Sequence, residues 1–227
     1  MKLKEHYDTI FASAKEKILS SQYQIDQNID SVTDTRRGLT LLIRPNQEVL
    51  HSIKALTDIL IKIEPQQYIY PSSDIHITVL SLISCYPNFN IGDIQLDDYI
   101  EIIQKSIRNI SPFEIKYQGI TASDSCIMLK GYYEKDTLDK LRNSLRESFK
   151  QSNIKQSVDS RYYLETAHST ILRIKKPLQD VSRYTSKIEE LTDINLGSFF
   201  VNQIELVYND WYQKSENVKL LATFKLE

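Results

Sequence analysis

The chain has 227 residues, 41% of them hydrophobic and 26% charged, so it is long enough to bury a substantial core. Its 28 lysines and arginines against 30 aspartates and glutamates give a net charge of −2, which disfavours coating of duplex nucleic acid by bulk charge but allows a small basic pocket. With five glycines and no GxGxxG or GxxxxGK[ST] string, most Gly-rich phosphate loops are excluded.

No segment approaches the roughly 18 apolar residues that span a membrane. Acidic residues interrupt the N-terminus where a signal peptide needs an apolar run, so we expect a helix there and no targeting signal. The two cysteines have no metal-binding spacing and are expected to be buried, reduced thiols. These features predict a cytoplasmic protein with no membrane association, and we expect a monomer.

Hydrophobic periodicity predicts alternating helices and strands. In chain order they are a helix at 3–20, strand 38–44, helix 47–63, strand 74–83, helix 96–109, strands 113–119 and 126–132, helix 137–150, strand 165–174, helix 181–191, and strands 199–208 and 218–226. The order strand, helix, strand, helix occurs once in each half, which is typical of a pseudo-duplicated α+β protein with two lobes around a central cleft. We assign residues 1–35 to an N-terminal helix and connector and 36–227 to the bilobal domain.

Two of the four histidines occupy nearly identical strings, DIHITVL around His76 and TAHSTIL around His168. Each string is His-x-Thr in an apolar, strand-like run, with one in each half. A shuffled chain with 13 threonines would place Thr two positions after two of four histidines in only ~2% of cases. His6 and His51 lack this context and are expected to be surface residues of helices.

The spacing places each histidine beside its threonine, because residues i and i+2 of a strand point to the same face. His76 with Thr78, and His168 with Thr170, should therefore project into the cleft. Two opposed imidazoles suit acid–base catalysis near pH 7, and two hydroxyls can hold a tetrahedral anion, which indicates phosphoryl chemistry on a diester. A metal site is disfavoured, because no HxH, HExxH or carboxylate stands at ligand spacing.

On these motifs, His76-Ile77-Thr78 and His168-Ser169-Thr170, the chain resembles the two-histidine (2H) phosphoesterase superfamily, which includes 2′-5′ RNA ligase and 2′,3′-cyclic phosphodiesterase-like proteins. The resemblance runs from about Arg37 to the C-terminus. It implies a bilobal fold with pseudo-duplicated antiparallel sheets and flanking helices. It also implies metal-independent, cofactor-free hydrolysis or formation of 2′-5′ or 2′,3′-cyclic phosphodiesters, with the histidines as acid and base and the threonines binding phosphate oxygens.

Some members of that superfamily carry an arginine shortly after the second motif, and Arg173 stands there. On an ideal strand Arg173 would lie on the face opposite His168, so its contact with phosphate requires a bulge or twist. The first motif has Leu80, Ser81 and Leu82 where a second arginine often stands, which weakens the case for a ligase-type substrate.

Substrate recognition is less defined by the sequence. Arg37, Arg44 and Lys130 lie at or beside predicted cleft strands and could neutralise a phosphate. Aromatic side chains that could stack on a base are Tyr208, Trp211, Tyr212, Tyr132 and Tyr133. The predicted partner is a small nucleotide or an RNA end. Two alternatives remain, a nucleotide-binding sensor without turnover and a mutarotase-like sugar isomerase.

Overall fold

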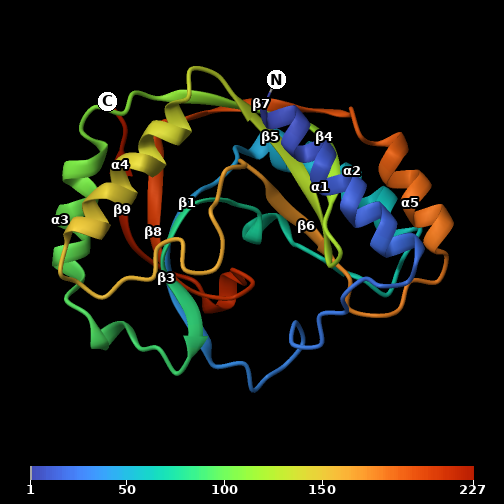
Figure 1. Cartoon of the computed structure of the whole chain (residues 1–227), viewed down its shortest axis with the longest axis horizontal. Coiled ribbons are helices and arrows are strands. Elements are labelled where there is room, and N and C mark those ends of the chain that lie inside the picture. Colours follow the sequence, from blue (N-terminus) through green and yellow to red (C-terminus); the bar gives the residue numbers. More distant parts are fainter. Residues whose placement is uncertain (1) are drawn as a thin grey trace.

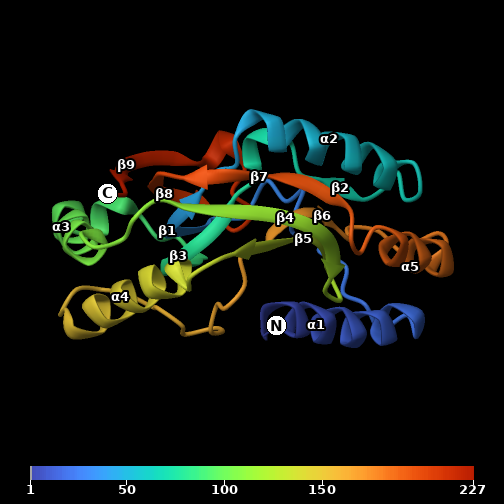
Figure 2. The same cartoon turned by 90° about the horizontal axis from the view of Figure 1, so that it is seen from above.

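The computed structural model describes residues 2–227 and contains two antiparallel sheets flanked by helices (Figures 1 and 2). The first sheet has the strand order β3-β1-β8-β9 and the second β2-β6-β5-β4-β7. The helices are α1 (Lys2–Leu19), α2 (Gln47–Ile61), α3 (Leu96–Ile107), α4 (Thr137–Gln151) and α5 (Val181–Glu190). The strands are β1 (Arg36–Ile43), β2 (Tyr68–Ile69), β3 (Ile77–Pro87), β4 (Phe113–Ala122), β5 (Cys126–Tyr133), β6 (Ser169–Arg173), β7 (Asn195–Val201), β8 (Gln203–Asp210) and β9 (Lys219–Lys225). The predicted bilobal α+β class with antiparallel sheets is confirmed.

The two lobes do not correspond to the two halves of the sequence. Strands β8 and β9, from the C-terminal end, join β1 and β3 in the first sheet. Helices α3 and α4 pack together beside the first sheet, whereas α1, α2 and α5 cover the second, and α2 packs on β7 (Figure 2). The chain therefore crosses between the lobes several times, and the two sheets share one continuous buried cluster of apolar side chains.

One predicted strand is wrong: residues 199–208 form parts of two strands, β7 and β8, in different sheets. Only Asn202 separates them, and no glycine or proline marks the break, so the apolar pattern reads as continuous. The short β2 was not predicted because two residues carry no periodicity. The strands expected at 74–83 and 165–174 begin later, at Ile77 and Ser169, so each motif histidine stands immediately before its strand.

Two of the helices, α2 and α5, start at a capping side chain. The Asn46 side chain accepts a hydrogen bond from Val49 N at the start of α2, and Asp180 accepts one from Arg183 N at the start of α5. Asp136 precedes α4 in a left-handed conformation, and its side chain makes no capping bond. No helix within residues 2–227 is long and apolar enough to cross a bilayer.

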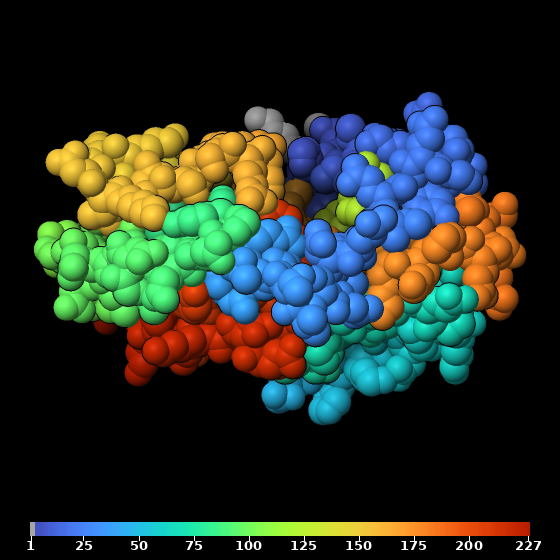
Figure 3. Space-filling view, turned by 90° about the horizontal axis from the view of Figure 1, so that it is seen from below, coloured from blue at the N-terminus to red at the C-terminus, as the bar shows by residue number. Residues whose placement is uncertain are grey.

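Helix α1 and the connector after it are tied into both lobes. The buried Tyr7 hydroxyl of α1 hydrogen-bonds both the N–H and the carbonyl of Gly131, at 3.2 Å each. Gly131 lies in β5 beyond Leu129, where the pairing with β6 ends. In the connector, Asp26 N donates to Ile174 O, and the carbonyl of Thr35 accepts from Asn88 N. Figure 3, which views the molecule from below relative to Figure 1, shows the connector in blue where it crosses between the lobes.

Candidate active site

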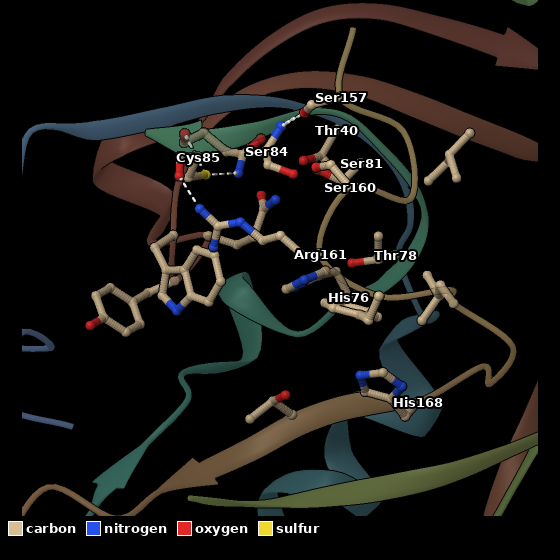
Figure 4. Close-up of a pocket in the computed structure, with 18 of the residues that line it drawn as sticks. Thr40, His76, Thr78, Ser81, Ser84, Cys85, Ser157, Ser160, Arg161 and His168 are labelled. Carbon is tan, nitrogen blue, oxygen red and sulfur yellow. Dashed lines mark hydrogen bonds between the residues drawn. The ribbon is translucent and has the colours of Figure 1, made fainter. Parts of the chain in front are cut away.

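The two motifs come from different sheets and line one pocket. His76 and Thr78 stand at the start of β3 in the first sheet, and His168 and Thr170 at the start of β6 in the second. On both motifs the flanking residues are buried while the histidine and threonine are partly exposed to the pocket. The structure thus brings the four motif residues to one pocket, on the faces that the two-residue spacing predicts. Figure 4 shows His76, Thr78 and His168 there.

A β-bulge follows each motif at the same place. Between β1 and β3 the register passes from Leu42↔Thr78 to Leu41↔Leu80, so one extra residue of β3 is unpaired. Between β5 and β6 it passes from Met128↔Thr170 to Ile127↔Leu172, which repeats the irregularity in the second motif. A bulge reverses the alternation of faces beyond it.

The bulge in β6 turns Arg173 toward the histidines, and this side chain lines the pocket. The bulge or twist that its placement required is therefore present. In the first motif the residue at the same distance beyond the threonine is Ser81, which also lines the pocket. The two halves of the site are thus unequal, because the second motif has a guanidinium at the position where the first has a hydroxyl.

Two buried groups hold the motifs against one another. The Ser169 hydroxyl donates to the His76 carbonyl at 2.5 Å, and the Tyr117 hydroxyl lies 2.5 Å from the same Ser169 oxygen. Arg142 of α4 is fully buried and donates to the carbonyls of Thr78 and Thr166, at 2.8 and 2.9 Å. These bonds join a residue of the first motif to one that flanks or belongs to the second, so they fix the relative position of the histidines.

Each imidazole is oriented through Nδ1. His76 Nδ1 lies 2.7 Å from the Asp74 carbonyl, which can only accept, so this nitrogen carries the proton. His168 Nδ1 lies 2.6 Å from Thr166 Oγ1, a hydroxyl that can donate or accept. Nε2 of each ring is therefore the nitrogen left to meet a ligand in the pocket.

The surroundings favour neutral imidazoles when the pocket holds no anion. Burial lowers the pKa of His76 to about 4, and the nearby Arg44 and Arg173 charges act in the same direction. Burial also lowers the pKa of His168 to about 4, helped by Arg142, His76 and Arg173. An anionic ligand would oppose both effects, since negative charge favours the imidazolium.

Positive charge and aromatic faces surround the histidines. Arg173 Nε donates to the Tyr70 hydroxyl at 2.8 Å, and its Nη1 lies 3.6 Å from Asp26. Arg161, from the segment between α4 and β6, donates to the Cys85 carbonyl at 2.7 Å, and its guanidinium lies 4.5 Å from the Trp211 ring centroid. The wall beyond Arg161 carries several hydroxyl side chains, Thr40, Ser81, Ser84, Ser157 and Ser160 (Figure 4).

Three cations that the sequence suggested for phosphate binding lie elsewhere. Arg37 lines a separate depression, and its Nη1 donates to the carbonyls of Asp34 and Arg36. Arg44 binds Glu205 and the Ser73 carbonyl, while Lys130 is buried within β5. A position at or beside a cleft strand does not tell which side of the sheet a side chain faces. The sequence therefore could not distinguish these three residues from those that line the pocket.

Of the aromatic candidates, Trp211 and Tyr212 line the pocket. The other three have partners elsewhere: Tyr208 bonds the Phe89 carbonyl, Tyr132 packs on Tyr7, and Tyr133 bonds Asp139. Sequence reasoning missed Arg161, Tyr70 and Arg142, which no motif marks. His6 and His51 are exposed on helices, as expected, and both cysteines are buried and form no disulfide.

No group of three or more histidine, cysteine or acidic side chains within residues 2–227 is arranged to hold a metal ion. The pocket instead offers two imidazoles, hydroxyls and a guanidinium. This donor set suits proton transfer and binding of a phosphate group.

Solved structures share this fold. TT0787 of Thermus thermophilus matches with a TM-score of 0.60 at 18% identity, over 83% of this chain and 97% of its own. A phosphoesterase matches with 0.60 at 15%, over 84% and 98%. Escherichia coli LigT complexed with 3′-AMP matches with 0.58 at 15%, also over 84% and 98%, and LigT has further structures with ATP, NADP+ and phosphate.

These matches confirm the fold that the resemblance implied, two antiparallel sheets with flanking helices. No protein-family model and no curated protein sequence matches the chain.

Proposed function

We propose that this protein is a metal-independent phosphodiesterase that hydrolyses, or reversibly forms, 2′-5′ or 2′,3′-cyclic phosphodiester bonds in small nucleotides or RNA ends. The observation that carries the proposal is the convergence of His76 and His168 from two sheets on one pocket, each with Nδ1 engaged. Thr78, Thr170 and Arg173 line the same pocket. Two histidines with Nε2 free to face a ligand are what an acid–base reaction at one phosphorus requires.

In the hydrolytic direction one imidazole takes a proton from water as the oxygen attacks phosphorus. The other gives a proton to the ribose oxygen as its bond to phosphorus breaks. The threonine hydroxyls and the Arg173 guanidinium would bind the non-bridging oxygens, where negative charge grows in the transition state. The reverse sequence, with a ribose hydroxyl as nucleophile, forms the ester.

Recognition of the nucleoside would fall to the aromatic and hydroxyl walls. The Trp211 and Tyr212 rings lie beside the pocket, and a stacked base contributes about 1–3 kcal/mol. LigT, which shares the fold, binds 3′-AMP, and this supports a nucleotide ligand here.

The experiment is turnover of a panel of 2′,3′-cyclic mononucleotides and a 2′-5′-linked dinucleotide, with EDTA present. His76→Ala and His168→Ala are expected to lose about 10²-fold or more each, because each removes a proton-transfer group. His51→Ala is the matched control, since His51 is exposed on α2. The position of the product phosphate, read by ³¹P NMR, identifies the leaving oxygen.

Equal activity of the wild type and both motif variants would refute the proposal. A wild type that binds nucleotides without turning them over would favour the sensor function. Turnover of a sugar that phosphate compounds do not inhibit would favour the isomerase.

A further inference from the structure

Arg142 is a buried cation whose hydrogen bonds go to main-chain carbonyls. Its side chain is 0% exposed, and its Nε and Nη2 donate to Val79, Thr78 and Thr166. Its Nη1 is buried without a partner. Burial lowers the pKa of Arg142 to about 10, so the group stays charged at neutral pH. Burying a cation with one of its N–H groups unpaired is costly, which points to a role for Arg142 at the site.

One turn along α4, Arg146 provides a contrast. It is also buried, but its Nε binds the Asp159 carboxylate at 3.0 Å and its Nη2 the Leu164 carbonyl. The charge of Arg146 is thus neutralised by an ion pair. Arg142 instead donates to the main-chain carbonyls of Thr78 and Thr166, and these bonds leave its positive charge unneutralised beside both motifs.

Arg142 breaks the symmetry of the two histidines. In both motifs a carbonyl stands two residues before the histidine, at Asp74 and at Thr166. The Asp74 carbonyl accepts from His76, whereas the Thr166 carbonyl is taken by Arg142 at 2.9 Å. His168 Nδ1 lies instead 2.6 Å from the Thr166 hydroxyl.

The two environments differ in how well they accept a proton. An imidazolium has two N–H donors and needs an acceptor for each, and the Asp74 carbonyl is a permanent one. Among the charges that act on the pKa of His76, Arg44 and Arg173 lower it and the Asp74 carboxylate raises it. The charges that act on the pKa of His168 come from Arg142, His76 and Arg173, and all three lower it. A proton shared by the pair is therefore better accommodated on His76.

We propose that Arg142 is a positioning residue that assigns the catalytic roles, keeping His168 neutral as the general base and leaving His76 as the general acid. This assignment rests on the proposed function. In hydrolysis, His168 Nε2 removes a proton from water while its Nδ1–H donates to Thr166 Oγ1, and the water oxygen bonds to phosphorus. His76 Nε2–H protonates the leaving oxygen as that P–O bond breaks.

The first test needs no turnover. Imidazole ¹⁵N shifts are followed from pH 3 to 8 in the wild type, with resonances assigned through His76→Ala and His168→Ala, and again with inorganic phosphate added. We expect His76 to take its proton at higher pH than His168. Arg142→Met should raise the pKa of His168 by about one unit or more, because a nearby like charge disfavours the imidazolium. Arg142→Lys should restore the wild-type order by keeping the charge.

Thr166→Val supplies a variant that leaves the buried arginine in place. It removes the acceptor for His168 Nδ1–H, so we expect the proton of neutral His168 to shift toward Nε2, and Thr166→Ser should reverse the change. This readout remains available if Arg142→Met does not fold. Protonation of His168 before His76 in the wild type, or an unchanged tautomer in Thr166→Val, would overturn the assignment.

The second test uses a cyclic phosphodiester with sulfur at the leaving position, because a thiolate departs without protonation. His76→Ala should lose no more than about tenfold on this substrate while losing about 10²-fold on the oxygen ester. His168→Ala should lose about 10²-fold on both. Rescue of His168→Ala instead would reverse the roles. Inactivity of the wild type on both esters would refute the proposed function and leave the proton assignment to the NMR titration.

Discussion

A methyl group added at Gly131 should displace the second motif. Gly131 lies in β5 beside Ala167, the residue before His168. A Cβ at position 131 would stand 2.0 Å from the Ala167 carbonyl oxygen and 3.0 Å from its carbon. The obstacle is main chain and not the end of a flexible side chain, so Gly131→Ala must move the backbone that carries His168.

The size of the effect follows from these distances. Contacts of a Cβ below 3.0 Å are essentially never observed, so the Ala167 carbonyl must move by about 1 Å. Overpacking of this kind costs about 1–3 kcal/mol of folding free energy. A misplacement of about 1 Å at a catalytic group can reduce turnover by about 10²-fold.

The assay compares urea denaturation and turnover of the best 2′,3′-cyclic nucleotide for Gly131→Ala and for Gly92→Ala. Gly92 is an exposed glycine at which a Cβ meets nothing closer than Asn90 Oδ1 at 3.3 Å, so this control should change neither quantity. A Gly131→Ala protein with wild-type stability and turnover within about threefold would refute the reasoning, because the strands would have absorbed the methyl group without moving His168.

Three further predictions concern groups around the same site. Tyr7→Phe leaves the N–H and carbonyl of Gly131 without their side-chain partner and should lower the free energy of unfolding by about 1–3 kcal/mol in urea, and an unchanged value would contradict this role for α1. The pKa values of about 4 for His76 and His168 lie below the value of about 6.5 in an unfolded chain, so stability should be full above pH 6.5 and fall as the pH drops toward 4. His168→Ala should flatten that slope in denaturation curves between pH 7 and 5, and the same slope in both proteins would count against neutral, buried imidazoles. Arg173→Gln should weaken the binding of inorganic phosphate about tenfold by calorimetry, because a charge-assisted hydrogen bond is lost, whereas Arg37→Gln, outside the pocket, should leave it unchanged.

Local pattern was enough to place the motif side chains and most of the secondary structure. The two-residue period of a strand puts His76 beside Thr78 and His168 beside Thr170, and the same alternation buries the residues between them. The helix predicted at 137–150 is observed at Thr137–Gln151, because its apolar residues recur at helical spacing with charged residues between them. These are properties of neighbouring residues, and a sequence displays them directly.

The tertiary structure decided which distant residues reach the site. Arg173 faces the pocket because a bulge in β6 reverses the alternation of side-chain faces beyond it. A bulge is defined by the pairing of two strands, so the residues of one strand do not reveal it. Arg161 and Arg142 arrive from a loop and a helix with no motif, and Arg37 points into another depression although it stands beside a cleft strand. The division of 199–208 between two sheets has the same origin, because strand partners are chosen by packing across the whole chain.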